Sequence, residues 1–191
     1  ELQTFGFVMT QMSARQGYKR YGRVAKEATK AEFKQLHDKG VFVPRHANEL
    51  TEEQKRAALR PVNLIKIKRD GTVKGRTCAD GRPQRPLYDK GETSSPTVTS
   101  EGLMLTTTIE AKENRDVACT DIVGAYLNAI MDDFVLLRLT GTDVDLMCEV
   151  DERYKQYVVY ENGQKVLYLQ LAKALYGCVK SALLWYNTFS E

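Results

Sequence analysis

The chain has 191 residues, of which 42% are hydrophobic, and a formal net charge of +3 at pH 7. This content suffices for one sizeable core or two small lobes. No apolar run is long enough for a transmembrane helix. The first residues lack the basic start and the apolar core of a secretory signal. Four cysteines without a Cys-x-x-Cys pair argue against a zinc site and are typical of a reducing compartment.

Apolar periodicity and turn residues predict a mixed α+β chain. Gly40 stops a helix, Pro44 ends a short strand, and Thr51 opens a Thr-x-x-Gln capping box. Asp70-Gly71 and Asn162-Gly163 are typical hairpin turns. In chain order we expect an irregular connector (1–23), a helix (24–39), a strand (41–43), a helix (51–59), a strand (64–68), a helix (101–112), strands (117–119, 134–139, 157–160, 165–169) and a helix from 171 to the end.

The most informative pattern lies between Val117 and Tyr126. A short apolar run follows a polar turn and predicts a buried strand that leads into Asp121. A carboxylate at the inner end of a buried strand is costly unless it is paired, and a divalent metal is the usual partner. The small residues Gly124 and Ala125 let the backbone approach a ligand. The alternative is a strand that ends in a helix-capping Asp, with Tyr126 in the core.

Positive charge is concentrated between Lys66 and Lys90. Eight basic residues stand against three acidic ones there, so this segment carries +5 and leaves −2 for the other residues. A basic ribbon on a near-neutral body suits a polyanion, either a nucleic-acid backbone or a nucleotide triphosphate. The alternative is a solvated hairpin edge, where lysines protect an exposed strand from aggregation.

Four motifs follow one another along residues 24–191. They are Lys66-Ile67-Lys68-Arg69-Asp70-Gly71-Thr72-Val73-Lys74-Gly75-Arg76, then Ser95-Pro96-Thr97, then Thr120-Asp121-Ile122-Val123-Gly124-Ala125-Tyr126, and last Lys173-Ala174-Leu175-Tyr176-Gly177 followed by Leu184-Trp185-Tyr186. In this order and spacing the set resembles the reverse transcriptases of copia-type (pseudovirus) retrotransposons. The resemblance implies an α+β fold, with mixed or antiparallel sheet and helices, that forms the fingers and part of the palm of a right-hand polymerase. It divides the chain into a connector (1–23), fingers (24–92), palm (93–130), fingers (131–178) and the start of a palm helix (179–191).

The resemblance also implies roles for the residues around the first acidic motif. Asp121 matches a catalytic aspartate and, with the carbonyl of Ile122, a ligand of Mg²⁺ or Mn²⁺ in two-metal phosphoryl transfer. The amides of Gly124 and Ala125 would approach the triphosphate. Tyr126 matches the aromatic gate that rejects a 2′-hydroxyl, so the resemblance implies a preference for deoxynucleotides.

The resemblance also implies roles for basic residues of the fingers. Lys68 and Arg76 match the residues that grip the incoming triphosphate, one as a point charge and the other as a bidentate fork. Lys66 or Arg69 replaces Lys68 if the hairpin shifts by one residue. Asp80 resembles a residue of the fingers that supports the template strand in reverse transcriptases. The residues before Asp80 differ from the usual family sequence, which leaves its role open. The expected nucleic-acid contacts are Lys66, Arg82 and Arg85.

A second pair of acids, Asp132 and Asp133, imitates the second catalytic motif of the family. It stands only about a dozen residues beyond Asp121, too few for the strands and helix that separate the two motifs. We expect an acidic surface turn there. The second motif proper is expected beyond Trp185.

The favoured hypothesis is the N-terminal part of an RNA-directed DNA polymerase that binds an RNA/DNA template-primer and dNTPs. The chain opens without Met and lacks the second Asp-Asp motif, so we expect a fragment that is inactive without the rest of its Pol polyprotein (the remaining palm, thumb, RNase H and integrase). The resemblance implies a cytoplasmic virus-like particle with a nuclear stage, and no membrane. The alternatives are a domesticated or decayed relic that only binds nucleic acid or a protein, and an unrelated metal-dependent nuclease or binding module.

Overall fold

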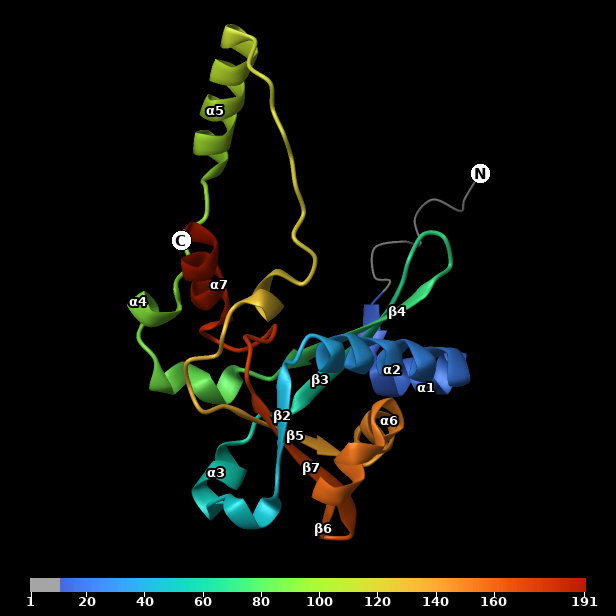
Figure 1. Cartoon of the computed structure of the whole chain (residues 1–191). Helices are drawn as coiled ribbons and strands as arrows, with labels where there is room; N and C mark the ends of the chain where they lie inside the picture. The colour runs from blue at the N-terminus through green and yellow to red at the C-terminus, as the bar shows by residue number, and fades with distance from the viewer. Residues whose placement is uncertain (1–10) are drawn as a thin grey trace.

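The computed structural model describes residues 11–191 as a mixed α+β fold with two antiparallel sheets (Figure 1). The first sheet has the order β1-β3-β4, and the second has the order β2-β7-β5 with β6 also paired to β7. The strands are β1 (Gln11–Ser13), β2 (Phe42–Arg45), β3 (Pro61–Ile67), β4 (Val73–Ala79), β5 (Leu136–Thr140), β6 (Val159–Glu161) and β7 (Gln164–Leu171). The helices are α1 (Ala14–Tyr21), α2 (Arg23–Asp38), α3 (Glu52–Ala57), α4 (Lys90–Thr93), α5 (Ser100–Glu113), α6 (Thr142–Val150) and α7 (Ser181–Ser190), with short 3₁₀ helices η1 (Ala47–Glu49), η2 (Arg82–Leu87), η3 (Ala125–Asn128) and η4 (Glu152–Tyr157). The α+β class with antiparallel sheets is confirmed.

Several predictions that rest on capping and turn residues are confirmed. Thr51 caps α3 through a reciprocal capping box with Gln54. Asn162 and Gly163 both have positive φ, 49° and 77°, as a two-residue turn between β6 and β7 requires. Helix α2 fills the range predicted as 24–39. No helix within the described residues is long and apolar enough to cross a membrane.

Strand β7 forms the centre of the main core. Val166, Leu167, Tyr168 and Leu169 are each at most 1% exposed. Their side chains alternate between two hydrophobic clusters, one of which includes Phe33 of α2, so both faces of the strand are covered. This double burial explains why the sequence of β7 is continuously apolar and not alternating.

The β3–β4 hairpin has one buried face and one exposed face. Ile65 is fully buried among residues of α1 and α2. On the other face Lys66 pairs with Lys74 across the two strands, and Leu64 pairs with Arg76. Because side chains alternate along a strand, these four residues share the face that points away from the helices.

The connector predicted for residues 1–23 is wrong where the structure describes it. Residues 11–13 form β1 and residues 14–21 form α1, which a capping box of Ser13 and Gln16 starts; residues 1–10 lie outside the described part. The buried positions of α1 are Ala14 and Gly17. Such small residues give a weak apolar signal, although they let the helix approach Ile65 of β3 closely.

Pro44 does not end its strand as predicted, because it lies within β2 opposite Leu169 of β7. Strand β2 is at the edge of the second sheet. A proline is tolerated there, since an edge strand has backbone groups that need no ladder partner.

The helix predicted from Leu171 onward is also wrong in its first ten residues. Leu171 still belongs to β7, and α7 begins only at Ser181. Between them the backbone bonds to other segments: the N–H of Ala174 donates to the carbonyl of Ala129 at 2.9 Å, and the carbonyl of Tyr176 accepts from the N–H of Ala79 at 2.7 Å. These long-range hydrogen bonds replace the helical ones.

The buried strand predicted at residues 117–119 is absent. Residues 111–121 are exposed, and no strand within residues 11–191 pairs with them. Helix α5, predicted correctly, has no buried residue, and with the chain that returns from it to η3 it projects away from the two sheets (Figure 1). A short apolar run forms a strand only where another strand satisfies its backbone.

Asp143 is a half-buried carboxyl between α6 and the first sheet. Burial raises its pKa to about 6, and a hydrogen bond with the side chain of Asn63 on β3 acts in the opposite direction. The ordinary pKa of an aspartate, 3.8, applies in the unfolded chain. The folded state therefore holds this proton more tightly, so the stability from the neutral carboxyl is complete below about pH 4 and is lost as the pH rises through about 6.

We expect Asp143→Asn to leave the free energy of unfolding unchanged near pH 4 and to raise it by about 1–2 kcal/mol near pH 7.5. Urea unfolding of both proteins across this range measures the difference. Glu32, whose pKa burial also raises, adds a slope of the same sign to both proteins. Asp145→Asn is the control, because Asp145 is exposed on the same helix and pairs only with Lys165 at the surface. Parallel pH profiles for the wild type and Asp143→Asn would contradict this prediction.

Candidate nucleotide and nucleic-acid site

The exposed face of the β3–β4 hairpin carries cations that lack an acidic partner. Five side chains are exposed along it and make no ion pair within residues 11–191: Lys66, Lys68, Arg69, Lys74 and Arg76. Eleven of the other lysines and arginines are paired with carboxylates: Arg23, Lys30, Lys34, Lys55, Arg82, Arg115, Arg138, Arg153, Lys155, Lys165 and Lys180. The five hairpin cations are close in sequence and make no such pair among the described residues, so their charge is available to an external anion.

Two glycines seat the loop of residues 172–180 on the end of β4. Gly177 has a φ of 93°, and a Cβ there would collide with the carbonyl of Ala79. A Cβ on Gly81 would collide with the carbonyl of Gly177. This close contact and the hydrogen bond between Tyr176 and Ala79 fix the loop beside the base of the basic hairpin.

The seated loop places Tyr176 against Tyr126. The two ring centroids are 4.6 Å apart, with 32° between the ring planes. Burial raises the pKa of the Tyr176 hydroxyl, while the Arg76 guanidinium and a hydrogen bond with the Tyr126 backbone act in the opposite direction. Tyr126 is half-buried and packs at the edge of the main core, as the core interpretation of this ring requires, while its role as a sugar gate stays a prediction. Residues from two of the four motifs thus meet at one place, beside the end of the strand that carries a third.

Lys39 is a residue of this place that the sequence did not single out. Its ammonium donates to the carbonyl of Val123 at 3.2 Å and lies beside Gly124, which has a φ of 64°. Ala125 follows as the first residue of η3. Lys39 was interpreted only as the end of a helix, and no local signal relates it to a loop 84 residues later.

Asp121 is not held as the predicted strand end would hold it. Its side chain is exposed, makes no ion pair within the described residues, and is followed by a half-buried Ile122. No group of three His, Cys, Asp or Glu side chains in residues 11–191 is arranged to hold a metal ion. The Asp121 carboxylate and the Ile122 carbonyl are oxygen donors that suit Mg²⁺, but they supply only part of its octahedral shell.

The predicted nucleic-acid residues Arg82 and Arg85 line an open cavity of about 450 Å³ at the base of the hairpin. Val62 and Cys78 line it as well, and they lie opposite one another on the exposed face that carries Arg76. Asp80, whose role stayed open, binds Arg82 through both carboxylate oxygens, and this pairing lowers the pKa of Asp80 to about 2. The cavity therefore continues the basic face of the hairpin.

The acidic pair at residues 132 and 133 is engaged with a cation. Lys180 binds Asp132 at 2.7 Å and Asp133 at 3.1 Å, and the Tyr88 hydroxyl donates to Asp133 at 2.6 Å. These contacts hold α7 and η2 together through a surface cluster. The arrangement is that of the acidic surface turn expected from the sequence.

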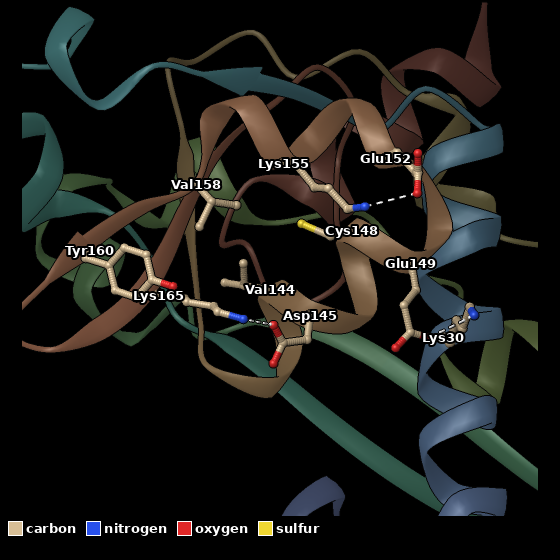
Figure 2. Close-up of a pocket in the computed structure, with 10 residues that line it drawn as sticks. All are labelled: Lys30, Val144, Asp145, Cys148, Glu149, Glu152, Lys155, Val158, Tyr160 and Lys165. Atoms are coloured by element: carbon tan, nitrogen blue, oxygen red, sulfur yellow. Dashed lines mark hydrogen bonds and ion pairs between the residues drawn. The ribbon is translucent and has the colours of Figure 1, made fainter.

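A larger cavity, of about 940 Å³, lies on the other side of α2 from the hairpin and contains none of the predicted site residues (Figure 2). Its three lysines are each paired with an acid across or beside the opening: Lys30 with Glu149, Lys155 with Glu152 and Lys165 with Asp145. Charge is balanced within this cavity, in contrast to the hairpin.

Comparison with protein-family models, with curated proteins and with solved structures gave no match for this chain.

Proposed function

We propose that this chain is the fingers–palm part of the RNA-directed DNA polymerase of a copia-type retrotransposon. The observation that carries the proposal is the stacking of Tyr176 on Tyr126 in a loop that bonds to Ala79, three residues beyond Arg76 on strand β4 of the basic hairpin. Arg76, Tyr126 and Tyr176 belong to three motifs spread over 100 residues of sequence. The resemblance predicts nucleotide contacts from two of those motifs, and the geometry supports one shared site for them.

In this proposal the chain's own residues hold the incoming dNTP. Arg76 binds phosphate oxygens through its guanidinium fork, and the backbone amides of Gly124 and Ala125 approach the same triphosphate. Lys39 adds positive charge beside Gly124. The ring of Tyr126 lies under the sugar. Mg²⁺, when bound with the help of Asp121, supplies Lewis-acid stabilisation of the transferring phosphoryl group.

The template-primer follows the basic face of the sheet. Lys66 and Lys74 lie opposite one another towards the tip, Arg76 follows nearer the base, and Arg82 and Arg85 line the cavity beyond it. Cations along one face of the sheet suit a phosphate backbone, which requires no base-specific contact; of these, Arg82 would have to share its guanidinium between Asp80 and a phosphate.

The exposed helix α5 supports the proposal from a different direction. Leu103, Met104 and Leu105 on this helix are 54%, 71% and 63% exposed, and Val117 on the returning chain is 60% exposed. An apolar surface of this kind needs a partner. We assign that role to the remaining palm of the same polyprotein, which would also give residues 117–119 a strand to pair with. Assembly in a cytoplasmic particle with a nuclear stage belongs to the same proposal.

A second candidate function is favoured by the carboxylate of Asp121, which is exposed and makes no ion pair within residues 11–191. A relic polymerase that binds nucleic acid without catalysis would keep the basic hairpin and would not need a metal site. This candidate predicts template-primer binding with no primer extension.

RNA-templated primer extension by the protein that carries this chain tests the proposal. The coding sequence downstream of Glu191 is expected to supply an aromatic-x-Asp-Asp motif, and the protein with both acidic motifs is expected to extend a DNA primer with dNTPs. A protein that has both motifs and does not extend the primer would reject the proposal. A coding sequence that has lost the Asp-Asp pair would leave the binding-only relic.

We expect the combined variant Lys66→Ala, Lys74→Ala, Arg76→Ala of residues 1–191 to lose most of its affinity for an RNA–DNA duplex. Each lost phosphate contact lowers the slope of log K against log salt by about 0.7–0.9, so the slope should fall by about 2 to 3. Fluorescence anisotropy of a labelled duplex at several salt concentrations measures both effects.

The matched control removes the same charge from the cavity of Figure 2 through Lys30→Ala, Lys155→Ala and Lys165→Ala. These lysines are already paired with acids, so the salt slope should stay at its wild-type value. Equal losses in the two triple variants would show a response to net charge alone and would remove the hairpin from the binding surface.

A further inference from the structure

The ring of Tyr176 contacts the ring of Tyr126. The two ring centroids are 4.6 Å apart, and the ring planes are tilted by 32°. Tyr176 is 36% exposed, which leaves one side of the ring pair open to solvent. A side chain that served only to fill the core would be more deeply buried.

The two segments that carry these rings are joined by backbone hydrogen bonds. The N–H of Ala174 donates to the carbonyl of Ala129 at 2.9 Å, and the N–H of Met131 donates to the carbonyl of Ala172 at 3.1 Å. On its other side, the loop of Tyr176 bonds to Ala79 at the end of β4. The backbone that carries Tyr176 is therefore held by hydrogen bonds on both sides.

Tyr126 packs against the main core on one side, but its backbone is less regular. It lies in the short 3₁₀ helix η3, directly after the irregular, exposed segment that contains Asp121. A half-exposed aromatic side chain in such a place changes rotamer unless a neighbour restricts it. Among the aromatic rings that the structure describes, Tyr176 is the one that stacks on it.

We propose that Tyr176 is the positioning residue for Tyr126, and that stacking of the two rings sets how strongly the site rejects a ribonucleotide. The inference rests on the proposed function, in which the Tyr126 ring lies under the sugar. A ring that swings away gives space to a 2′-hydroxyl, whereas a ring held in place excludes it.

Primer extension by the polymerase that carries this chain tests the inference with Tyr176→Ala and Tyr176→Phe. The measured quantity is the ratio of kcat/KM for a dNTP to that for the matching rNTP. Tyr176→Ala should lower this ratio about 3- to 10-fold, which corresponds to the usual contribution of an aromatic pair, with a higher KM for the dNTP and a kcat near the wild-type value. Tyr176→Phe keeps the ring and should keep the ratio. Tyr160→Ala, at a 72% exposed tyrosine of β6, is the control and should change neither.

A second measurement uses residues 1–191 alone and does not depend on catalysis. The NMR signals of the Tyr126 ring should be displaced by the ring current of Tyr176, should stay displaced in Tyr176→Phe, and should move toward random-coil values in Tyr176→Ala. The amide spectrum of each variant shows whether it is folded. Unmoved Tyr126 signals in a folded Tyr176→Ala chain would overturn the stack.

The failures are distinguishable. A wild-type polymerase that does not extend primers would overturn the proposed function and this inference together. A wild-type polymerase that extends primers, with the same sugar ratio in Tyr176→Ala, would overturn only the inference. An equal fall of the dNTP-to-rNTP ratio of kcat/KM in Tyr176→Phe and Tyr176→Ala would also overturn the inference, because the aromatic ring would then not be the group that sets the selectivity.

Discussion

Asp121→Asn is expected to reduce RNA-templated primer extension at least about 10³-fold in the polymerase that carries this chain, a loss of about 4 kcal/mol of barrier lowering. The substitution keeps the size of the side chain and removes the negative charge that a metal ligand needs. Asp121 is exposed and unpaired within the described residues, so its replacement should not change folding. Thermal unfolding and duplex binding should therefore stay at their wild-type values.

The matched control for this loss is Asp116→Asn. Asp116 is an exposed aspartate of the same irregular segment, five residues earlier, and it belongs to no motif. Its replacement should leave extension unchanged. Near-normal extension by Asp121→Asn would remove this residue from the catalytic site. Equal losses in the two variants would point to the charge of the whole segment and not to a ligand.

Tyr126→Ala is expected to raise the incorporation of ribonucleotides about 10²-fold relative to deoxynucleotides, because removal of the ring opens space for the 2′-hydroxyl. Tyr126→Phe keeps the ring and should keep the selectivity. The ring also packs against the main core, so Tyr126→Ala should lower the unfolding temperature as well. Steady-state incorporation of one dNTP and its matching rNTP measures the ratio.

These two outcomes of Tyr126→Ala separate the sequence interpretations of this residue. If Tyr126 is a sugar gate, its removal changes the ratio of rNTP to dNTP incorporation in the folded protein. A core tyrosine changes only stability. If the unfolding temperature falls while the ratio stays at its wild-type value, Tyr126 is a core residue and the resemblance has assigned it a role that it does not have.

The chain has a small net charge, and yet the hairpin forms a strongly basic local surface. Sequence counting places +5 between Lys66 and Lys90, but it does not show which of these cations are neutralised. In the fold Arg82 is paired with Asp80, while Lys66, Lys74 and Arg76 share one open face of the sheet. The face became evident from the antiparallel register, which the Asp70-Gly71 turn largely determines.

Several features were predictable because residues close in sequence determine them. Helix α2 follows from apolar spacing, the start of α3 from the Thr51–Gln54 capping box, and the β6–β7 turn from Asn162-Gly163. The energies involved act within one helical turn or across one hairpin. The failures have the opposite origin. Residues 117–119 have strand composition but no described strand beside them, and residues 172–180 have helical spacing but bond to Ala79 and Ala129 instead.

By itself, the sequence determined the α+β class, the basic hairpin and the positions of the motifs around Asp121, Tyr126 and Tyr176. Only the tertiary structure decided which of those motifs meet. It brought Tyr176 onto Tyr126, placed Lys39 beside Gly124, and left Asp121 exposed on a segment that projects from the body. The reason is physical: local patterns reflect interactions over a few residues, whereas these contacts join segments tens of residues apart whose closeness depends on the packing of both sheets.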